Sequence, residues 1–436
     1  MGGADDLPLT DEEFADRADR LCLPGAMAIA VSGGADSVAL LDLAVAYART
    51  RGCAVTALTV DHGLRGESAR EATVVAALAG TMGIPHVTLR WEGQKPLVNL
   101  EAKARAARYA LMGDWCRRAG VAQLLTAHSR DDQAETVLMR LARGSGVDGL
   151  AAMTERRDMG GIALVRPLLD VPRTRLEARL RAKGQSWAVD PMNSDSQFLR
   201  VRVRQARAVL DDLGLTATRL AGTARAMARA RQALEEVADR LQEDAVRVMP
   251  QGWCTFDLDR LARAPDEIAL RVLSRILMGV GGLTYRPRLE RLERLYAALR
   301  SGALAGGRTL AGCHIRAAGR GQVTVLREAA LVDATPLALA PGGRMLWDGR
   351  FEVALRADGP VGAHVCPVGV LDKGLADRAS SDLLTGCPAA HRATLPGLWV
   401  NDALVSAPLI GLEVGAGEGF SASFVLKARP KTRGEA

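Results

Sequence analysis

A six-residue stretch near the N-terminus has the composition of an anion-binding turn. Residues 32–37 read Ser-Gly-Gly-Ala-Asp-Ser and follow an apolar run, residues 27–31, that has the length of a buried strand. Gly33 and Gly34 allow positive φ angles and place no Cβ between the backbone and a ligand. Successive backbone N–H groups in such a turn, followed by a helix N-terminus, bind phosphate. Because the Gly-Lys-Ser/Thr of a Walker A loop is absent, the stretch predicts a phosphate site of another kind.

Acidic side chains cluster in a second stretch, residues 128–136, which read His-Ser-Arg-Asp-Asp-Gln-Ala-Glu-Thr. If a helix begins here, Asp132 and Glu135 lie three residues apart and Asp131 and Glu135 four apart, so the carboxylates share one face. Acids in a first helical turn can simply complement the helix dipole. Placed after a strand and beside a phosphate turn, they are also candidates to hold Mg²⁺ or to bind a cationic substrate.

Two groups of arginines are candidates for phosphate contacts. Glu101, Arg105 and Arg108 are spaced by four and three residues and line one stripe of a predicted helix. Residues 200–204 read Arg-Val-Arg-Val-Arg, which points the arginines one way on a strand and spreads them round the axis on a helix. Either group also fits a solvated ion-pair face, which contributes little stability. The functional alternative is a bidentate contact between a guanidinium and a phosphate.

The elements that must position these residues alternate between strand and helix patterns up to about residue 207. Further strands are predicted at residues 54–60, 86–91, 123–127 and 163–166, and helices at residues 67–82, 99–119 and 130–143. Such alternation builds a doubly wound, mostly parallel, Rossmann-like sheet whose ligands bind beyond the carboxyl ends of the strands. The glycine turn, the pair Asp61-His62 and His128 each follow a predicted strand, so we expect them at one edge of the sheet.

The composition changes near residue 215. Residues 216–248 are rich in Ala, Arg and Glu with helical periodicity, and more helices are predicted at residues 265–278 and 289–299. Strand-like runs around residues 319–321 predict a hairpin, and short strands in Gly/Pro-rich sequence follow. We predict an α/β domain over residues 1–214, a mainly helical domain with the hairpin over residues 215–330, and a small mixed, β-rich module over residues 331–436.

Composition limits the remaining functional classes. The net charge of +7 over 436 residues permits an anionic partner such as nucleic acid. Seven scattered cysteines with no C-x-x-C pair disfavour a disulfide framework, a zinc site and an iron–sulfur cluster. No apolar run reaches transmembrane length, and residues 1–22 are acidic and polar rather than a signal peptide. We expect a cytoplasmic protein without membrane contact, and a homodimer is left open.

Taken together, the motifs resemble those of a known enzyme family. Residues 32–37 are similar to the PP-loop of the N-type ATP pyrophosphatases, which cleave ATP to AMP and pyrophosphate. The whole ordered set resembles tRNA(Ile)-lysidine synthetase over about the first 210 residues. It comprises Ser32-Gly-Gly-Ala-Asp-Ser37, Val60-Asp-His-Gly-Leu-Arg65, Glu101…Ala-Arg-Tyr109, Leu125-Thr-Ala-His128 with Asp-Asp-Gln-Ala-Glu-Thr136, Arg143-Gly-Ser-Gly146, Arg166-Pro-Leu-Leu169 and Asp190…Asn193. One position departs from the family pattern: Val201 replaces the usual asparagine, which removes an amide and keeps the flanking arginines.

The resemblance implies a bacterial tRNA-modifying ligase. Such an enzyme converts cytidine 34 in the CAU anticodon of tRNA(Ile) to lysidine, so that the tRNA reads AUA instead of AUG. The cytosine C2 carbonyl oxygen attacks the α-phosphate of ATP and pyrophosphate leaves. The ε-amine of free L-lysine then attacks C2, and AMP leaves. The implied cofactors are ATP and Mg²⁺, and the implied partners are tRNA(Ile) and lysine, with the modules beyond residue 215 holding the tRNA body.

The resemblance also implies roles for individual residues. The expected nucleotide-binding residues are Ser32, Gly33, Gly34, Ala35, Asp36, Ser37, Asp61, His62, Arg108 and His128. Asp36 is expected to help hold Mg²⁺, and Arg200 to contact tRNA or nucleotide. Asp132 and Glu135 are expected around the ammonium groups of lysine, where a carboxylate can take the proton that the ε-amine must lose before it attacks. The catalytic set is Asp36, Arg108, Asp132 and Glu135.

Two alternative functions compete with this one. A tRNA thiolase of the same superfamily needs a nucleophilic cysteine pair or a cluster held by cysteines, and none of the motifs contains a cysteine. A tRNA-binding protein with an inactive site is expected to lose catalytic motifs first, whereas residues 32–37 and 128–136 are intact.

Overall fold

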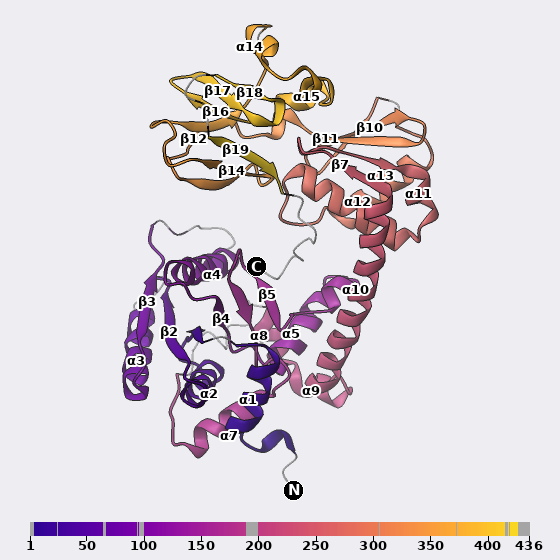
Figure 1. The fold of residues 1–436 in the computed structure, drawn as a ribbon. Coiled ribbons are helices and arrows are strands. Elements are labelled where there is room, and N and C mark those ends of the chain that lie inside the picture. The colour runs from indigo at the N-terminus through magenta and orange to yellow at the C-terminus, as the bar shows by residue number, and fades with distance from the viewer. Residues whose placement is uncertain are drawn as a thin grey trace. The chain divides into compact units, whose positions relative to one another are not determined.

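A six-stranded sheet organises the first part of the chain in the computed structural model (Figure 1). The structure describes residues 4–23, 25–63, 67–93, 95, 100–188, 199–304, 306–371, 373–414, 417 and 419–425. The chain divides into two compact units that meet at residues 231 and 232. The three domains proposed from composition, with boundaries after residues 214 and 330, stay a prediction.

The sheet of the first unit has the strand order β3-β2-β1-β4-β6-β5. Its strands are β1 (Ala26–Ala30), β2 (Ala54–Asp61), β3 (His86–Arg90), β4 (Gln123–Leu125), β5 (Arg156–Asp158) and β6 (Ala163–Val165). All neighbouring strands are parallel except β5 and β6. This confirms the predicted mostly parallel sheet, to which the unpredicted β5 adds a short antiparallel edge.

The order of the strands reverses at β1, because β2 and β3 extend the sheet on one side and β4 and β6 on the other. In sheets of this type a ligand binds beyond the carboxyl ends of the two strands on either side of the reversal. Here those strands are β1 and β4. The glycine turn follows β1 and residues 126–129 follow β4, so the two strongest motifs of the sequence meet at this point.

Helices cover both faces of the sheet. They are α1 (Asp11–Arg20), α2 (Ala35–Arg51), α3 (Glu67–Met82), α4 (Leu100–Arg118), α5 (Arg130–Leu141), α6 (Val147–Leu150), α7 (Arg173–Ala182), α8 (Leu199–Gln205) and α9 (Arg207–Asp212). Met27 and Ile29 of β1 pack in one core with residues of α1, α2 and α7, whereas Ala28 faces a second core with α4. β1 is therefore buried on both faces, which explains its continuous apolar sequence.

The long helix α10 (Ala217–Ala245) continues from the first unit into the second (Figure 1). Three further helices follow: α11 (Leu258–Arg263), α12 (Asp266–Gly281) and α13 (Leu289–Arg300). They pack on an antiparallel sheet of β7 (Val246–Val248), β8 (Cys254–Asp257), β11 (Gln322–Arg327), β10 (Cys313–Gly319) and β9 (Arg308–Leu310), in that order. β10 and β11 form the predicted hairpin, and Gly319, Arg320 and Gly321 in its turn all have positive φ angles.

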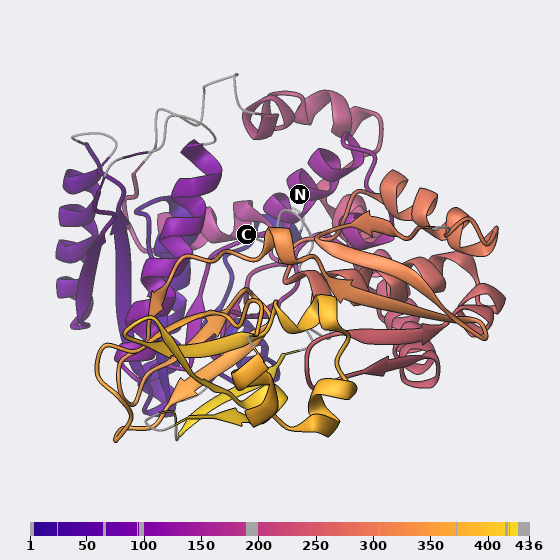
Figure 2. The same ribbon diagram turned by 90° about the horizontal axis from the view of Figure 1, so that it is seen from above.

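Two small antiparallel sheets complete the second unit (orange to yellow in Figure 2). One contains β12 (Leu337–Ala338), β15 (His364–Pro367), β16 (Pro396–Val400), β17 (Ala403–Ala407) and β18 (Leu412–Glu413), and the other β13 (Arg344–Trp347), β14 (Phe351–Leu355) and β19 (Phe420–Phe424). Three short helices accompany them: α14 (Lys373–Arg378), α15 (Ser381–Thr385) and α16 (Ala389–Arg392). Across the described part of the chain, none of the helices combines the length and the apolarity needed to span a bilayer.

Candidate active site

The turn between β1 and α2 leaves the backbone N–H groups at the start of α2 open to a ligand. Gly34 is the N-cap of α2, and no side chain caps the N–H groups of its first turn. The N–H of Ser32 donates to Oγ of Ser37 (3.2 Å), and that hydroxyl donates to the carbonyl of Gly34 (2.9 Å), so side-chain hydrogen bonds hold the turn closed. Gly33 has φ +86°, a conformation that side chains disfavour. This geometry is suited to hold phosphate at a helix N-terminus.

Asp36, in the first turn of α2, has one paired and one unpaired carboxylate oxygen. Its Oδ2 accepts a hydrogen bond from Nε of Arg173 (2.9 Å). Its Oδ1 is buried and has no hydrogen-bond partner among the described residues. Burial raises the pKa of the Asp36 carboxyl to about 6, against the opposing charge of Arg173. A buried carboxylate oxygen without a partner is a suitable ligand for Mg²⁺.

The described residues contain no group of three or more His, Cys, Asp or Glu side chains that could hold a metal ion. A metal at Asp36 would therefore take most of its ligands from elsewhere. This matches the usual behaviour of Mg²⁺, which binds through one or two carboxylates together with substrate phosphates and water.

The acidic helix α5 begins in a capping box. The N–H of Ser129 donates to Oδ2 of Asp132 (2.9 Å), so Asp132 stabilises the helix N-terminus as well as facing the site. Asp132 and Glu135 are only 7% and 4% exposed. Burial on its own would raise the pKa of Asp132, but neighbouring positive charges, Arg200 and Arg173 among them, hold it below its usual value. Asp132 is therefore ionised at neutral pH.

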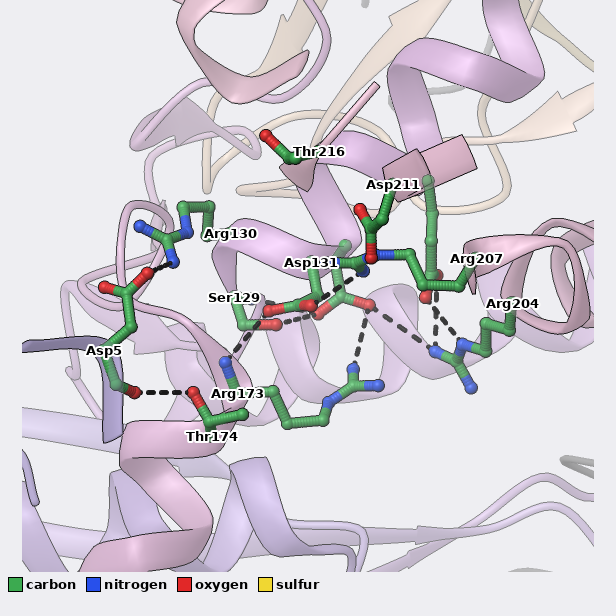
Figure 3. Close-up of polar contacts among 12 residues, drawn as sticks. Asp5, Ser129, Arg130, Asp131, Arg173, Thr174, Arg204, Arg207, Asp211 and Thr216 are labelled. Atoms are coloured by element: carbon green, nitrogen blue, oxygen red, sulfur yellow. Dashed lines mark hydrogen bonds and ion pairs between the residues drawn. The ribbon is translucent and has the colours of Figure 1, made fainter. Parts of the chain in front are cut away.

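Asp131 points to a different set of partners. Its Oδ2 accepts from the backbone N–H of Arg173 (2.9 Å), at the first residue of α7, and its Oδ1 from Nη1 of Arg207 (3.0 Å). Figure 3 shows Asp131 between these two arginines. Asp131 thus joins α5 to the start of α7 and to α9, so these contacts stabilise the packing of the three helices.

Glu135 is held by two arginines of α8. Nε of Arg200 lies 2.8 Å from its Oε2, and Nε of Arg204 donates to its Oε1 at 2.6 Å. Since residues 199–205 are helical, arginines four residues apart share one face, whereas Arg202 lies on another. Val201 is buried at 6% exposure, so the side chain that departs from the family pattern is withdrawn from solvent.

His128 lies beside this cluster and is neutral. Burial lowers the pKa of the imidazole, and the charge of Arg166 lowers it further. Its Nδ1 is 3.0 Å from Oγ1 of Thr126, the residue directly after β4. His128 therefore offers hydrogen bonds rather than charge to a ligand.

The remaining nucleotide candidates are Arg108 on α4 and the residues at the end of β2. Arg108 contacts the ring of Tyr109 (5.4 Å to the centroid), and its Nε is buried without a hydrogen-bond partner among the described residues. Burial and the nearby charge of Arg108 both lower the pKa of His62. Asp61 accepts a hydrogen bond from the N–H of Gly63 (2.9 Å) through its Oδ1. The side chain of Glu101 and the motif residues 64–65 and 190–195 lie outside the described residues.

Comparison with known proteins agrees with this geometry. Residues 12–210 match the PP-loop domain family. The tRNA(Ile)-lysidine synthase of Ruegeria pomeroyi is 41% identical over 408 residues, which cover 90% of both chains. The tRNA(Ile)-lysidine synthase of Methylobacterium nodulans is 47% identical over 321 residues, which cover 72% of this chain and 94% of the relative. That of Wolbachia pipientis is 34% identical over 344 residues, with coverage of 78% and 80%.

The chain belongs to the tRNA(Ile)-lysidine synthase family. The resemblance predicted from the ordered motifs is thereby confirmed, as is the PP-loop fold. The individual site assignments stay predictions. The structure brings Asp36, Asp132 and Glu135 into one cluster with Arg200.

In this member of the lysidine synthase family, Arg173 is not predicted from the sequence, and Arg204 is predicted only as one of the alternating arginines of residues 200–204. Arg173 pairs with Asp36, and its Nη2 lies 3.6 Å from Oδ1 of Asp132. Arg204 belongs to the alternating arginines, whose pattern does not distinguish it from Arg202. The one signal in the sequence for Arg173 is its position seven residues after Arg166, the start of the Arg-Pro-Leu-Leu motif.

A cavity of about 80 Å³ lies against α5. Its charged lining consists of Asp131, Glu135, Arg173, Arg204 and Arg207. Its apolar lining consists of Ala134, Leu138, Val203, Leu210, Leu215, Ala217 and Leu220. The cavity thus combines an apolar wall with two carboxylates that are paired with arginines.

Proposed function

We propose that this protein ligates free L-lysine to C2 of cytidine 34 in a tRNA(Ile) with a CAU anticodon, using ATP. The observation that carries the proposal is the cluster at the reversal of the sheet. There an uncapped phosphate turn and buried acids lie within one network of ion pairs, in a member of the lysidine synthase family. Family membership favours this activity over tRNA thiolation.

In the first half-reaction, the residues after β1 bind the nucleotide. The free N–H groups at the start of α2 would hold the phosphates and stabilise the charge that grows on the departing pyrophosphate. Oδ1 of Asp36 is the proposed ligand for the metal of Mg·ATP. Mg²⁺, when bound, would neutralise charge on the phosphates. Arg108, with its unpartnered buried Nε among the described residues, is the proposed contact to the nucleotide.

In the second half-reaction, the acids of α5 receive lysine. The apolar wall of the cavity would cover the alkyl stem, and Glu135 would face an amine. Both oxygens of Glu135 contact arginines in this structure, so an amine reaches this carboxylate only if Arg200 or Arg204 moves. A phosphate of the adenylate or of the tRNA offers such an arginine a bidentate partner.

The second unit is proposed to bind the tRNA backbone. A hollow of about 410 Å³ between α13 and β9 is lined by Arg291, Arg294 and Arg308 together with three uncharged residues. All three arginines are exposed, and the side chains of Arg294 and Arg308 donate to backbone carbonyls of their own segments. Three such guanidiniums around one hollow offer positive charge to nucleic-acid phosphates. The basic tail at residues 427–433, also expected to bind tRNA, lies outside the described residues.

The test is incorporation of labelled lysine into RNA. The full-length protein is incubated with ATP, Mg²⁺, labelled L-lysine and an unmodified tRNA(Ile) transcript, with a transcript carrying uridine at position 34 as control. We expect ATP-dependent label in the first transcript alone. Pyrophosphate exchange with ATP that yields no labelled RNA would contradict the proposal and favour another use of the adenylated tRNA. A cytoplasmic location follows from these substrates, and the oligomeric state is a separate measurement.

A further inference from the structure

Arg173, which is not predicted from the sequence, contacts two of the acids that are, Asp36 and Asp132. It is the first residue of α7, and its side chain reaches back to α2 and α5. Its Nε donates to Oδ2 of Asp36 at 2.9 Å, and its Nη2 lies 2.9 Å from the same oxygen and 3.6 Å from Oδ1 of Asp132. One guanidinium therefore links the helix that follows β1 to the helix that follows β4.

The approach of Arg173 leaves Asp36 asymmetric. Both contacts of the guanidinium reach Oδ2, so Oδ1 remains buried without a hydrogen-bond partner among the described residues. A fork-shaped guanidinium often pairs with both oxygens of a carboxylate, which would have occupied Asp36 completely. The contact to Oδ2 alone instead keeps the other oxygen for a ligand.

The backbone of Arg173 is fixed independently of its side chain. Its N–H donates to Oδ2 of Asp131 (2.9 Å), so the start of α7 is tied to α5. Because this contact uses the main chain, substitutions of the Arg173 side chain leave it intact. The side chain can therefore be changed while the helix keeps its anchor.

Arg175, two residues further along α7, makes contacts away from the site. Nη1 and Nη2 of Arg175 donate to the two oxygens of Glu13 on α1, at 3.0 and 2.6 Å, in a two-pronged ion pair. Arg175 also donates to backbone carbonyls of residues 7 and 8. It thus packs α7 against the N-terminal segment and does not reach the site, which makes it a matched control.

We propose that Arg173 is a positioning residue for the metal-bound nucleotide. It holds Asp36 through Oδ2 so that Oδ1 is presented to the metal of Mg·ATP. Its contact with Asp132 holds this carboxylate in place beside the acid that receives the second substrate. The inference rests on the proposed function for the metal role of Asp36 and for the identity of that second substrate. The role of Arg173 in nucleotide binding can be tested without catalytic turnover.

Equilibrium ATP binding by calorimetry, over a series of Mg²⁺ concentrations, tests the inference. Arg173→Gln removes the charged contact, and we expect ATP affinity in saturating Mg²⁺ to fall about ten- to a hundredfold. In EDTA the variant and the parent should bind ATP alike. Arg173→Lys keeps the charge and should recover part of the loss. Arg175→Gln should leave the Mg²⁺ dependence unchanged even if it lowers the melting temperature.

A double-mutant cycle separates positioning from a structural role. If Arg173 acts through Asp36, then Arg173→Gln should cause little further loss of Mg²⁺-dependent binding in an Asp36→Asn background. Equal losses of ATP affinity with Mg²⁺ and in EDTA, or additive losses in the cycle, would overturn the inference. Binding is measured without tRNA or lysine, so failure of lysine incorporation would refute the proposed function and leave this result standing.

Discussion

Two clusters of arginines and carboxylates, one in each unit, use the same chemistry to different ends. In the second unit, Glu235 of α10 pairs with Arg271, Arg275 and Arg286, and both of its oxygens are engaged. The side chains of Arg271 and Arg275 are 3% and 2% exposed. In the first unit, Arg173, Arg200 and Arg204 are 28%, 33% and 29% exposed.

The difference between the clusters is whether a carboxylate oxygen is left without a partner. Around Glu235 the pairing of the carboxylate is complete, so that cluster joins α10 to α12. In the first unit Asp36 keeps a buried oxygen with no partner among the described residues, and the arginines are reachable from solvent. A closed cluster stabilises a fold, whereas an open one can exchange its contacts for a ligand. Variants in either cluster test this contrast.

The largest effect is expected from breaking the closed cluster. Glu235→Gln leaves Arg271 and Arg275 buried without their common carboxylate. Removing one partner of a buried ion pair costs about 3–5 kcal/mol. Denaturant unfolding should show this loss in the second unit, while ATP binding by the first unit stays at the parent value. A stable Glu235→Gln variant would show that Asp239 and Glu267 compensate for the lost charge.

In the open cluster, Asp36→Ala should remove adenylation of tRNA. Loss of a group that stabilises developing charge typically lowers the rate about 10²- to 10³-fold. Formation of pyrophosphate from ATP and tRNA measures this step, and a filter-binding assay should give nearly unchanged tRNA affinity. An Asp36→Ala variant that adenylates tRNA at the normal rate would exclude the proposed metal role.

The folding stability of the second unit should depend on pH through a buried histidine. His391 is 0% exposed, donates through Nε2 to the carbonyl of Gln251 (2.8 Å) and accepts from the N–H of Arg327 at Nδ1 (3.3 Å). Burial lowers its pKa to about 4. The neutral ring therefore stabilises the fold fully above its unfolded pKa of about 6.5, and this contribution is lost as the pH falls toward 4.

The loss from His391 should reach about 3 kcal/mol at pH 4, since each unit of difference in pKa corresponds to about 1.4 kcal/mol. Unfolding of the second unit between pH 7 and 4 measures it. The His391→Gln variant should show a flatter dependence over this range. Parallel pH curves for the variant and the parent would assign the acid sensitivity to other groups.

Glu135→Gln should lower the affinity for lysine more than it lowers the stability of the fold. Its arginine partners are partly exposed, so water can solvate them when the charge of Glu135 is removed, which limits the loss of folding free energy. A charged hydrogen bond to lysine is worth about 1.5–3 kcal/mol. The lysine concentration for half-maximal ligation should rise about ten- to a hundredfold, and adenylated tRNA should accumulate at low lysine. Loss of adenylation at an unchanged lysine requirement would instead make Glu135 a nucleotide residue.

The smallest effect is expected at the arginine hollow of the second unit. Replacing Arg291, Arg294 and Arg308 by Gln should weaken tRNA binding. It should also make the plot of log binding constant against log salt concentration less steep. The slope should fall by up to about 0.9 for each phosphate that the protein no longer neutralises. A charge-matched control replaces the exposed Arg316, Arg320 and Arg344. Equal salt slopes for the two triple variants would show that net charge, rather than this hollow, binds the tRNA.

Much of the fold could be predicted because its signals are local. The apolar runs of β1, β2 and β4 and the periodicity of α3, α5 and α12 depend on neighbours in the chain, and the structure places these elements within a few residues of the prediction. The phosphate turn is also local, since two glycines and a helix start suffice to expose its N–H groups. β5 could not be predicted because its three residues, two of them arginine, carry no apolar pattern.

Which arginine meets which acid was decided by the tertiary structure. Arg173 and Asp36 are 137 residues apart and pair because β4 lies beside β1, which brings the starts of α2, α5 and α7 together. The alternating arginines of residues 200–204 fit a strand or a helix equally well, and the helical geometry of α8 directs Arg200 and Arg204 toward Glu135. Sequence spacing determines the face of an element, whereas the order of strands in a sheet determines what that face meets.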